Sequence, residues 1–164
     1  MQTFAQDAPA RSRADQLVRA GWILGVGGLV PFVVGTLLIA TYSEIADPSY
    51  LWLAVSAWAA VILSFLGGAR WGAALNETAR KSPTTLALSV IPSLAAWVFV
   101  QLPQPWNFVG FAVAFSVQGV WDYTATREGR IETPWYAQLR LVLTVVVVLC
   151  MVAVAFATAQ PVAL

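Results

Sequence analysis

Apolar residues in this chain are gathered into five long runs that short polar segments separate. A membrane-spanning helix needs about 20 apolar residues, because a hydrocarbon core of ~30 Å is crossed at 1.5 Å per residue. Each run is close to that length. We therefore predict an all-α, polytopic membrane protein, a bundle of five transmembrane helices. The predicted spans are 21–41, 50–71, 85–102, 106–123 and 139–158.

The breaks between the runs have chemical causes. Glu44, Asp47 and Pro48 end the first run. Charged and polar residues occupy the second break, 76–83, and the fourth, 127–134. The third break contains Pro103-Gln104-Pro105, and two prolines so close together forbid a continuous helix.

The ends of the chain are polar or short. Residues 1–16 show no apolar periodicity. We predict a cytoplasmic tail over residues 1–19, followed by the transmembrane domain 20–158 and a short tail, 159–164. A secretory signal would have an apolar stretch of roughly 7–15 residues. The first run here is longer, so an uncleaved membrane helix is the prediction.

Composition supports a membrane location and excludes several kinds of chemistry. Apolar residues make up 59% of the chain and charged residues 10%, whereas soluble domains have about 45–50% and about 25%. Histidine is absent and Cys150 is the single cysteine, so the usual haem, zinc and iron–sulfur ligands are missing. We expect no cofactor, no metal and no catalytic residues. The basic residues are too few and too dispersed for nucleic acid.

Positive charges alternate between successive segments. All nine lie in the N-terminal tail, in the second or fourth break, or at helix ends beside them. The positive-inside rule then predicts that the N-terminus is cytoplasmic and the C-terminus is on the far side. Trp52 and Trp106 would mark outer ends, and Trp71, Trp121 and Trp135 inner ends. The nine residues are Arg11, Arg13, Arg19, Arg70, Arg80, Lys81, Arg127, Arg130 and Arg140.

Polar residues inside the spans fall at one predicted depth. Asp122 lies about 24 Å along its helix from Trp106, and Arg70 about 30 Å from Tyr50. Both are then near the inner boundary, where the fifth span begins. A carboxylate in low dielectric needs a partner, and the two arginines at this depth can supply one. We predict an inner polar layer of Arg70, Asp122 and Arg140, with Gln118 and Thr144 just above it.

The layer has two interpretations. It could be a substrate or ion site. Alternatively, the arginines reach toward lipid phosphates while Asp122 serves as a structural ion pair. Residues so near the interface do not incur the full midplane cost, which favours the structural interpretation.

Small residues and prolines also form patterns. Ser64, Gly68 and Gly72 recur every four positions in the second span, which predicts close packing against another helix, with a narrow ligand path as the alternative. Pro31 and Pro92 lie inside the first and third spans and are predicted to kink them. A hinge or a broken-helix binding site is the alternative.

Four segments together resemble a known family. They are Leu63–Gly72 (LSFLGGARWG), Val90–Ser93 (VIPS), Asp122, and Pro134–Arg140 (PWYAQLR) with Thr144. They resemble the domain of unknown function 3429, a group of small bacterial inner-membrane proteins to which the mitochondrial transmembrane protein 69 of animals is similar. The resemblance implies the helical fold and an inner membrane, and it implies no established activity.

Three functions are weighed. The first is a structural or accessory membrane component that packs with itself or with a larger complex. The second is a minimal oligomeric transporter or channel using Gln118 and Asp122, although no inverted repeat is visible. The third is a lipid-headgroup enzyme with Asp122 as base, which the absence of histidine disfavours. We expect a multi-pass protein of the bacterial inner membrane, with the mitochondrial inner membrane as the alternative. The expected partners are the lipid bilayer and another membrane protein or a second copy.

Overall fold

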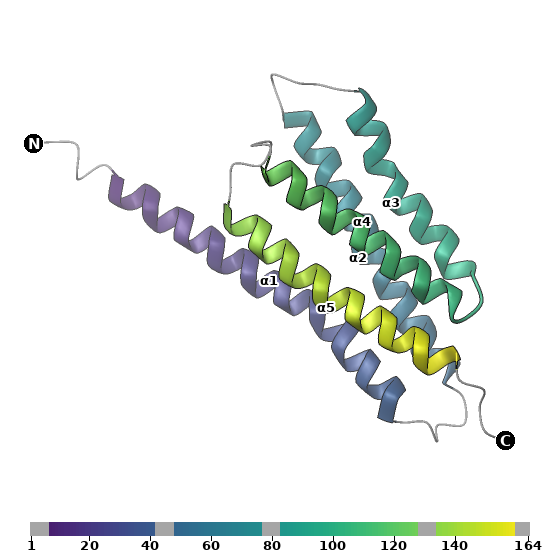
Figure 1. The fold of residues 1–164 in the computed structure, drawn as a ribbon. Coiled ribbons are helices and arrows are strands. Elements are labelled where there is room, and N and C mark those ends of the chain that lie inside the picture. Colours follow the sequence, from purple (N-terminus) through teal and green to yellow (C-terminus); the bar gives the residue numbers. More distant parts are fainter. Residues whose placement is uncertain (1–6, 42–47, 77–82, 128–133, 160–164) are drawn as a thin grey trace, which may run out of the picture.

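The fold is helical throughout the residues that the computed structural model describes, which are 7–41, 48–76, 83–127 and 134–159. These residues form five α-helices and no strand (Figure 1). Each helix contains nearly all of one predicted span. The helices are α1 (Asp7–Thr41), α2 (Ser49–Asn76), α3 (Pro83–Gln101), α4 (Trp106–Arg127) and α5 (Pro134–Ala159).

Successive helices pack side by side and alternate in direction. Helix α1 also contacts α5, which closes the bundle, and α2 contacts α4 across it. The start of α1 and the end of α5 lie at opposite ends of the bundle (Figure 1). Helices α2 and α4 run parallel to each other, because one antiparallel helix separates them.

Helix α1 begins earlier than the hydropathy pattern predicts. The apolar run was expected to start at residue 21, yet the helix starts at Asp7 and includes most of the predicted tail. A helix satisfies its own backbone hydrogen bonds, so a polar sequence can extend it beyond the apolar part. Pro9 lies in the first turn, where proline is tolerated. The predicted breaks around Glu44, Lys81 and Arg130 and the end of the chain from residue 160 lie outside the described residues.

Four of the helices are long and apolar enough to cross a membrane: α1, within Asp15–Thr41, together with α2, α3 and α5. Helix α4 is less apolar because it contains Asn107, Gln118 and Asp122. These three side chains are buried inside the bundle, where helices rather than lipid surround them. The polarity of α4 therefore reflects its place among the other helices.

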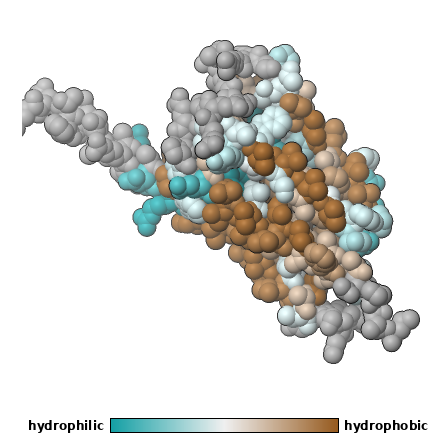
Figure 2. All heavy atoms as spheres, viewed as in Figure 1, coloured by the Kyte–Doolittle hydropathy of each residue, from teal (hydrophilic) through white to brown (hydrophobic). Residues whose placement is uncertain are grey.

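The outer surface is apolar, as a membrane protein requires. Ile23, Leu24, Phe65, Leu149 and Phe156 are among the large hydrophobic side chains that are exposed. Figure 2 shows hydrophobic residues covering the middle of the visible face. Soluble monomers rarely expose apolar patches larger than a few hundred Å². The chain is a membrane protein with transmembrane helices.

The core is built around aromatic and small residues. Phe32 of α1 meets Phe115 of α4 edge to face with ring centres 5.9 Å apart, and Phe99 meets Phe111 in the same way at 5.5 Å. Buried aromatic pairs of this geometry contribute beyond their buried area. The largest completely buried side chains are Phe32, Leu63, Phe108, Asn107, Phe111, Met151 and Val154.

Glycine permits close packing of α2 on α3, but not at the predicted position. A Cβ on Gly67 would lie 2.5 Å from the backbone oxygen of Ser89 and 3.5 Å from Pro92. A Cβ on Gly68 or Gly72 would meet nothing within 4 Å. The intramolecular contact is therefore made one residue before the predicted stripe, and Gly68 and Gly72 face away from the other helices. Pro31 and Pro92 both lie inside continuous helices, and their kinks stay predictions.

A matched pair of substitutions tests this packing. Gly67→Ala should lower stability by about 1–3 kcal/mol, because the added methyl group forces the α2 and α3 backbones apart. Gly68→Ala should be neutral or slightly stabilising, since alanine favours helix and finds open space. Thermal unfolding in detergent measures both. Equal melting temperatures for the two variants would show that the helices do not approach at Gly67.

Candidate functional site

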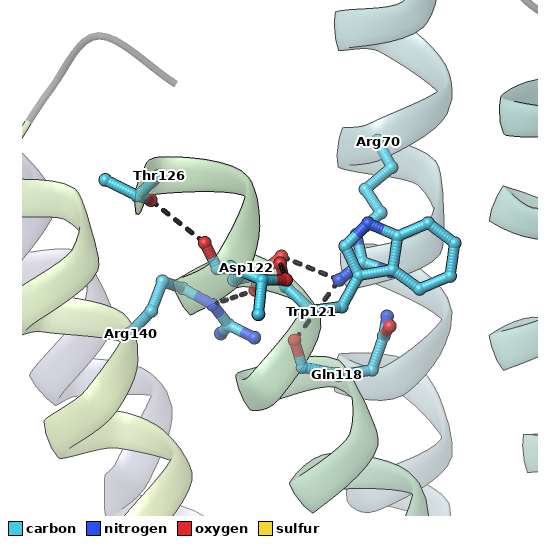
Figure 3. Close-up of polar contacts among 7 residues, drawn as sticks. Arg70, Gln118, Trp121, Asp122, Thr126 and Arg140 are labelled. Carbon is cyan, nitrogen blue, oxygen red and sulfur yellow. Dashed lines mark hydrogen bonds and ion pairs between the residues drawn. The ribbon is translucent and has the colours of Figure 1, made fainter. Parts of the chain in front are cut away.

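One carboxylate joins three helices near one end of the bundle. Asp122 of α4 accepts a hydrogen bond on Oδ1 from Nη2 of Arg70, on α2, at 2.7 Å. Its Oδ2 accepts one from Nε of Arg140, on α5, at 2.6 Å. The side chains are 8%, 15% and 9% exposed, in the order Asp122, Arg70, Arg140. Figure 3 shows the carboxylate between the two guanidinium groups. We call these three residues the charge cluster.

Further contacts hold the charge cluster in place. Nη2 of Arg70 also donates to the backbone oxygen of Gln118 at 3.2 Å, and its guanidinium lies 4.4 Å from the ring centre of Trp121. The hydroxyl of Thr126 donates to the backbone oxygen of Asp122 at 2.9 Å (Figure 3). Hydrogen bonds to charged groups and a cation over an indole ring both compensate for lost hydration.

The two other residues of the predicted layer lie close by without joining the cluster through their side chains. Gln118 is 4% exposed, and its Nε2 has no hydrogen-bond partner among the described residues. Thr144 packs against Gly119. A Cβ added to Gly119 would lie 2.6 Å from the methyl carbon of Thr144. Thr144 thus marks where α5 packs closely on α4.

Some contacts of the site were not expected from the sequence. Trp121, predicted to mark the inner end of its helix, also covers the guanidinium of Arg70 with its ring. Asn107 donates to the hydroxyl of Ser56 at 2.9 Å, which forms a second polar contact between α4 and α2. An asparagine one position into the α4 run was a visible signal for a buried partner. The serine hydroxyl it meets could not be found without the helix arrangement.

The chemistry that the cluster can perform is limited by its geometry. Both carboxylate oxygens of Asp122 already accept charge-assisted hydrogen bonds, and the group is enclosed. Within the described residues, no group of three or more histidine, cysteine, aspartate or glutamate residues could hold a metal ion. The arrangement can hold three helices in fixed register. It can also bind an anion, since two arginines face one carboxylate.

The segments that suggested a family come together in space. Gly67 of the first segment packs on Pro92 of the second, and Arg70, Asp122 and Arg140 form the charge cluster. Fold and cluster together define a small helical membrane protein with a buried Arg–Asp–Arg contact.

The chain belongs to the family described as "Protein of unknown function (DUF3429)", whose model matches residues 17–156. It is similar to transmembrane protein 69 of Xenopus tropicalis, with 33% identity over 135 residues. That match covers 79% of this chain and 51% of the relative, so the chain spans about half the length of that protein. No solved structure matches.

Removing the carboxylate should destabilise the bundle. Asp122→Asn leaves two largely buried arginines without a counter-charge, and breaking a buried ion pair in this way costs about 3–5 kcal/mol. The double variant Asp122→Asn with Arg140→Gln should recover part of that loss, because it removes one of the unpaired charges. Thermal unfolding of the wild type and the single and double variants measures the coupling. Unchanged stability of Asp122→Asn would contradict a structural role for the cluster.

Proposed function

We propose that this protein is a structural or accessory component of a membrane, without enzymatic activity, that packs with a second copy or with a larger membrane complex. The observation that favours this function most is a contrast between two surfaces. The carboxylate of Asp122 is enclosed by its own chain, whereas the small-residue face of α2 has open space at Gly68 and Gly72.

The enclosed cluster argues against transport through this site. A transporter needs its polar residues to open on a water-filled path. Asp122 and Gln118 are both buried, and neither lines the cavity between α1, α2 and α5 or the one between α4 and α5. An ion pair fixed in this way supports a role in holding α2, α4 and α5 together.

The uncovered face of α2 has the composition of a helix-packing surface. Gly68 and Gly72 have open space at the Cβ position, and Ala54, Ala57 and Val61 of the same face are exposed. In lipid, helices associate where small residues let two backbones approach closely. The absence of a Cβ at Gly68 and Gly72 would let the backbone of a second membrane helix approach α2 closely here.

A bulky residue on this face should prevent assembly without disturbing the fold. Gly68→Leu should shift the protein, extracted in mild detergent, from a larger assembly to a single copy, because the side chain occupies the space of the partner. Gly27→Leu is the matched control, since Gly27 of α1 is also exposed with open space at its Cβ. Native electrophoresis and light scattering give the sizes. A single copy in the wild type, with no co-purifying protein, would contradict the proposed function.

We further propose five membrane crossings in the bacterial inner membrane, with the N-terminus in the cytoplasm. Helix α1 starts at one end of the bundle and α5 finishes at the other, which supports an odd number of crossings (Figure 1). The start of α1 and the arginines of the charge cluster belong to the same end of the bundle. Cytoplasmic ends of membrane helices are enriched in arginine and lysine.

Single cysteines test this topology. In a Cys150→Ser background, Gln2→Cys should react with an impermeant maleimide only after the cells are lysed, whereas Ala163→Cys should react in intact spheroplasts. Complete labelling of both variants in detergent is the control for reactivity. Equal labelling of both ends in intact spheroplasts would place them on one side and overturn the five-crossing topology.

A further inference from the structure

A cavity of about 330 Å³ lies between α1, α2 and α5, and Phe115 of α4 also lines it. Its lining runs from Trp135 to Val147 on α5, which is about 18 Å of helix. The volume is within the ~300–1,000 Å³ of ligand pockets in proteins. We call this cavity the α1–α5 groove.

The groove is amphipathic along its length. Tyr136 and Arg140 line it near the start of α5, and Thr144 follows one turn later. Farther along, the walls are apolar and include Phe32 and Val147. The side chains fit a molecule with a polar group at one end and a hydrocarbon chain behind it.

Glycines of α1 leave the space for the groove. Gly21 and Gly25 are covered by α5 side chains. A Cβ on Gly21 would lie 2.8 Å from Trp135, and one on Gly25 would lie 3.0 Å from Leu143. One turn on, Gly28 also lines the groove, and a Cβ there would meet nothing within 4 Å. The indole of Trp58 donates to the backbone oxygen of Gly28 at 3.1 Å, which fixes this part of α1 against α2. The groove is therefore open beside Gly28 and held in shape by its neighbours.

The lining also reaches the lipid-facing surface. Leu24 and Phe65 belong to the groove and are 75% and 67% exposed, respectively. A ligand can thus enter sideways from the hydrocarbon of the membrane. That route favours a lipid over a solute dissolved in water.

The charge balance favours an anion. In the part of the chain that the structure describes, the charge cluster has two arginines and one carboxylate, which leaves one positive charge in excess. Arg140 gives its Nε to Asp122, and among the described residues its two Nη atoms make no hydrogen bond (Figure 3). A largely buried cation without a full set of partners is costly. A phosphate group has the charge and the acceptor geometry that a guanidinium prefers.

We propose that the α1–α5 groove binds an anionic glycerophospholipid, with its phosphate on Arg140 and one acyl chain along the apolar walls. Basic pockets between membrane helices commonly hold anionic headgroups. Tyr136 lies beside Arg140 in the lining and is a second donor for the phosphate. This site does not depend on any partner protein. It adjoins the packing face of α2 at Phe65, but Gly68 and Gly72 do not line it.

The test is retention of defined lipids by the full chain. The purified protein in detergent is mixed with phosphatidylglycerol, phosphatidylcholine or oleate, and bound lipid is counted by native mass spectrometry. Phosphatidylglycerol should be retained about fivefold more than phosphatidylcholine, the preference that one basic residue gives an anionic lipid. Equal retention of these two phospholipids, or preferential retention of oleate, overturns the proposal without any variant being needed.

Two neighbouring glycines locate the site. Gly28→Leu fills the groove and should lower phosphatidylglycerol retention about fivefold, to the level of phosphatidylcholine. Gly27→Leu adds the same side chain one residue earlier, facing outward, and should leave retention unchanged. Full retention in Gly28→Leu, or equal loss in both variants, would show that the lipid binds elsewhere. Gly68→Leu should retain lipid as the wild type does, which separates this result from the test of assembly.

Discussion

The contact of Asp122 with Arg70 and Arg140 is the interaction on which the arrangement of α2, α4 and α5 depends. Within lipid, apolar surfaces gain little by leaving the solvent, so helices are positioned by close packing and polar contacts. The charge cluster lies near one end of α2. The second polar contact joins Ser56 of α2 to Asn107 of α4. Ser56 lies 14 residues before Arg70, about 21 Å along the helix. Two polar contacts at that separation align α2 and α4 in parallel and fix their register.

Helix α4 shows why hydropathy alone describes this fold incompletely. Its buried polar residues lower its average, so it is not among the four helices apolar enough to span a membrane by composition. Yet those residues contact α2 and α5, and its outward residues Val113 and Val117 are exposed and apolar. A hydropathy average treats each helix as if lipid surrounded it. The family model matches residues 17–156, a range that includes the whole of α4.

Much of the fold could be predicted from the sequence, because membrane helices must be long and apolar and the breaks between them are chemically distinct. The depth of Arg70, Asp122 and Arg140 followed from the rise of a helix, and the structure brings these residues into contact. The depth of a residue along its helix does not show which neighbouring helix that residue faces. Gly67 and Gly68 are the same residue type, and only the arrangement of α3 shows which one permits close packing. The α1–α5 groove was equally invisible, since four helices contribute to its lining.

The length of α1 has a consequence for the groove. The whole helix, Asp7–Thr41, has 35 residues and measures about 52 Å, whereas its apolar run, 21–41, measures about 31 Å and matches a hydrocarbon core of ~30 Å. The polar first part of α1 therefore continues past the start of α5 (Figure 1). Because Gly21 and Trp135 line the polar end of the α1–α5 groove, the turns of α1 before Gly21 lie beyond that end, where a headgroup would emerge.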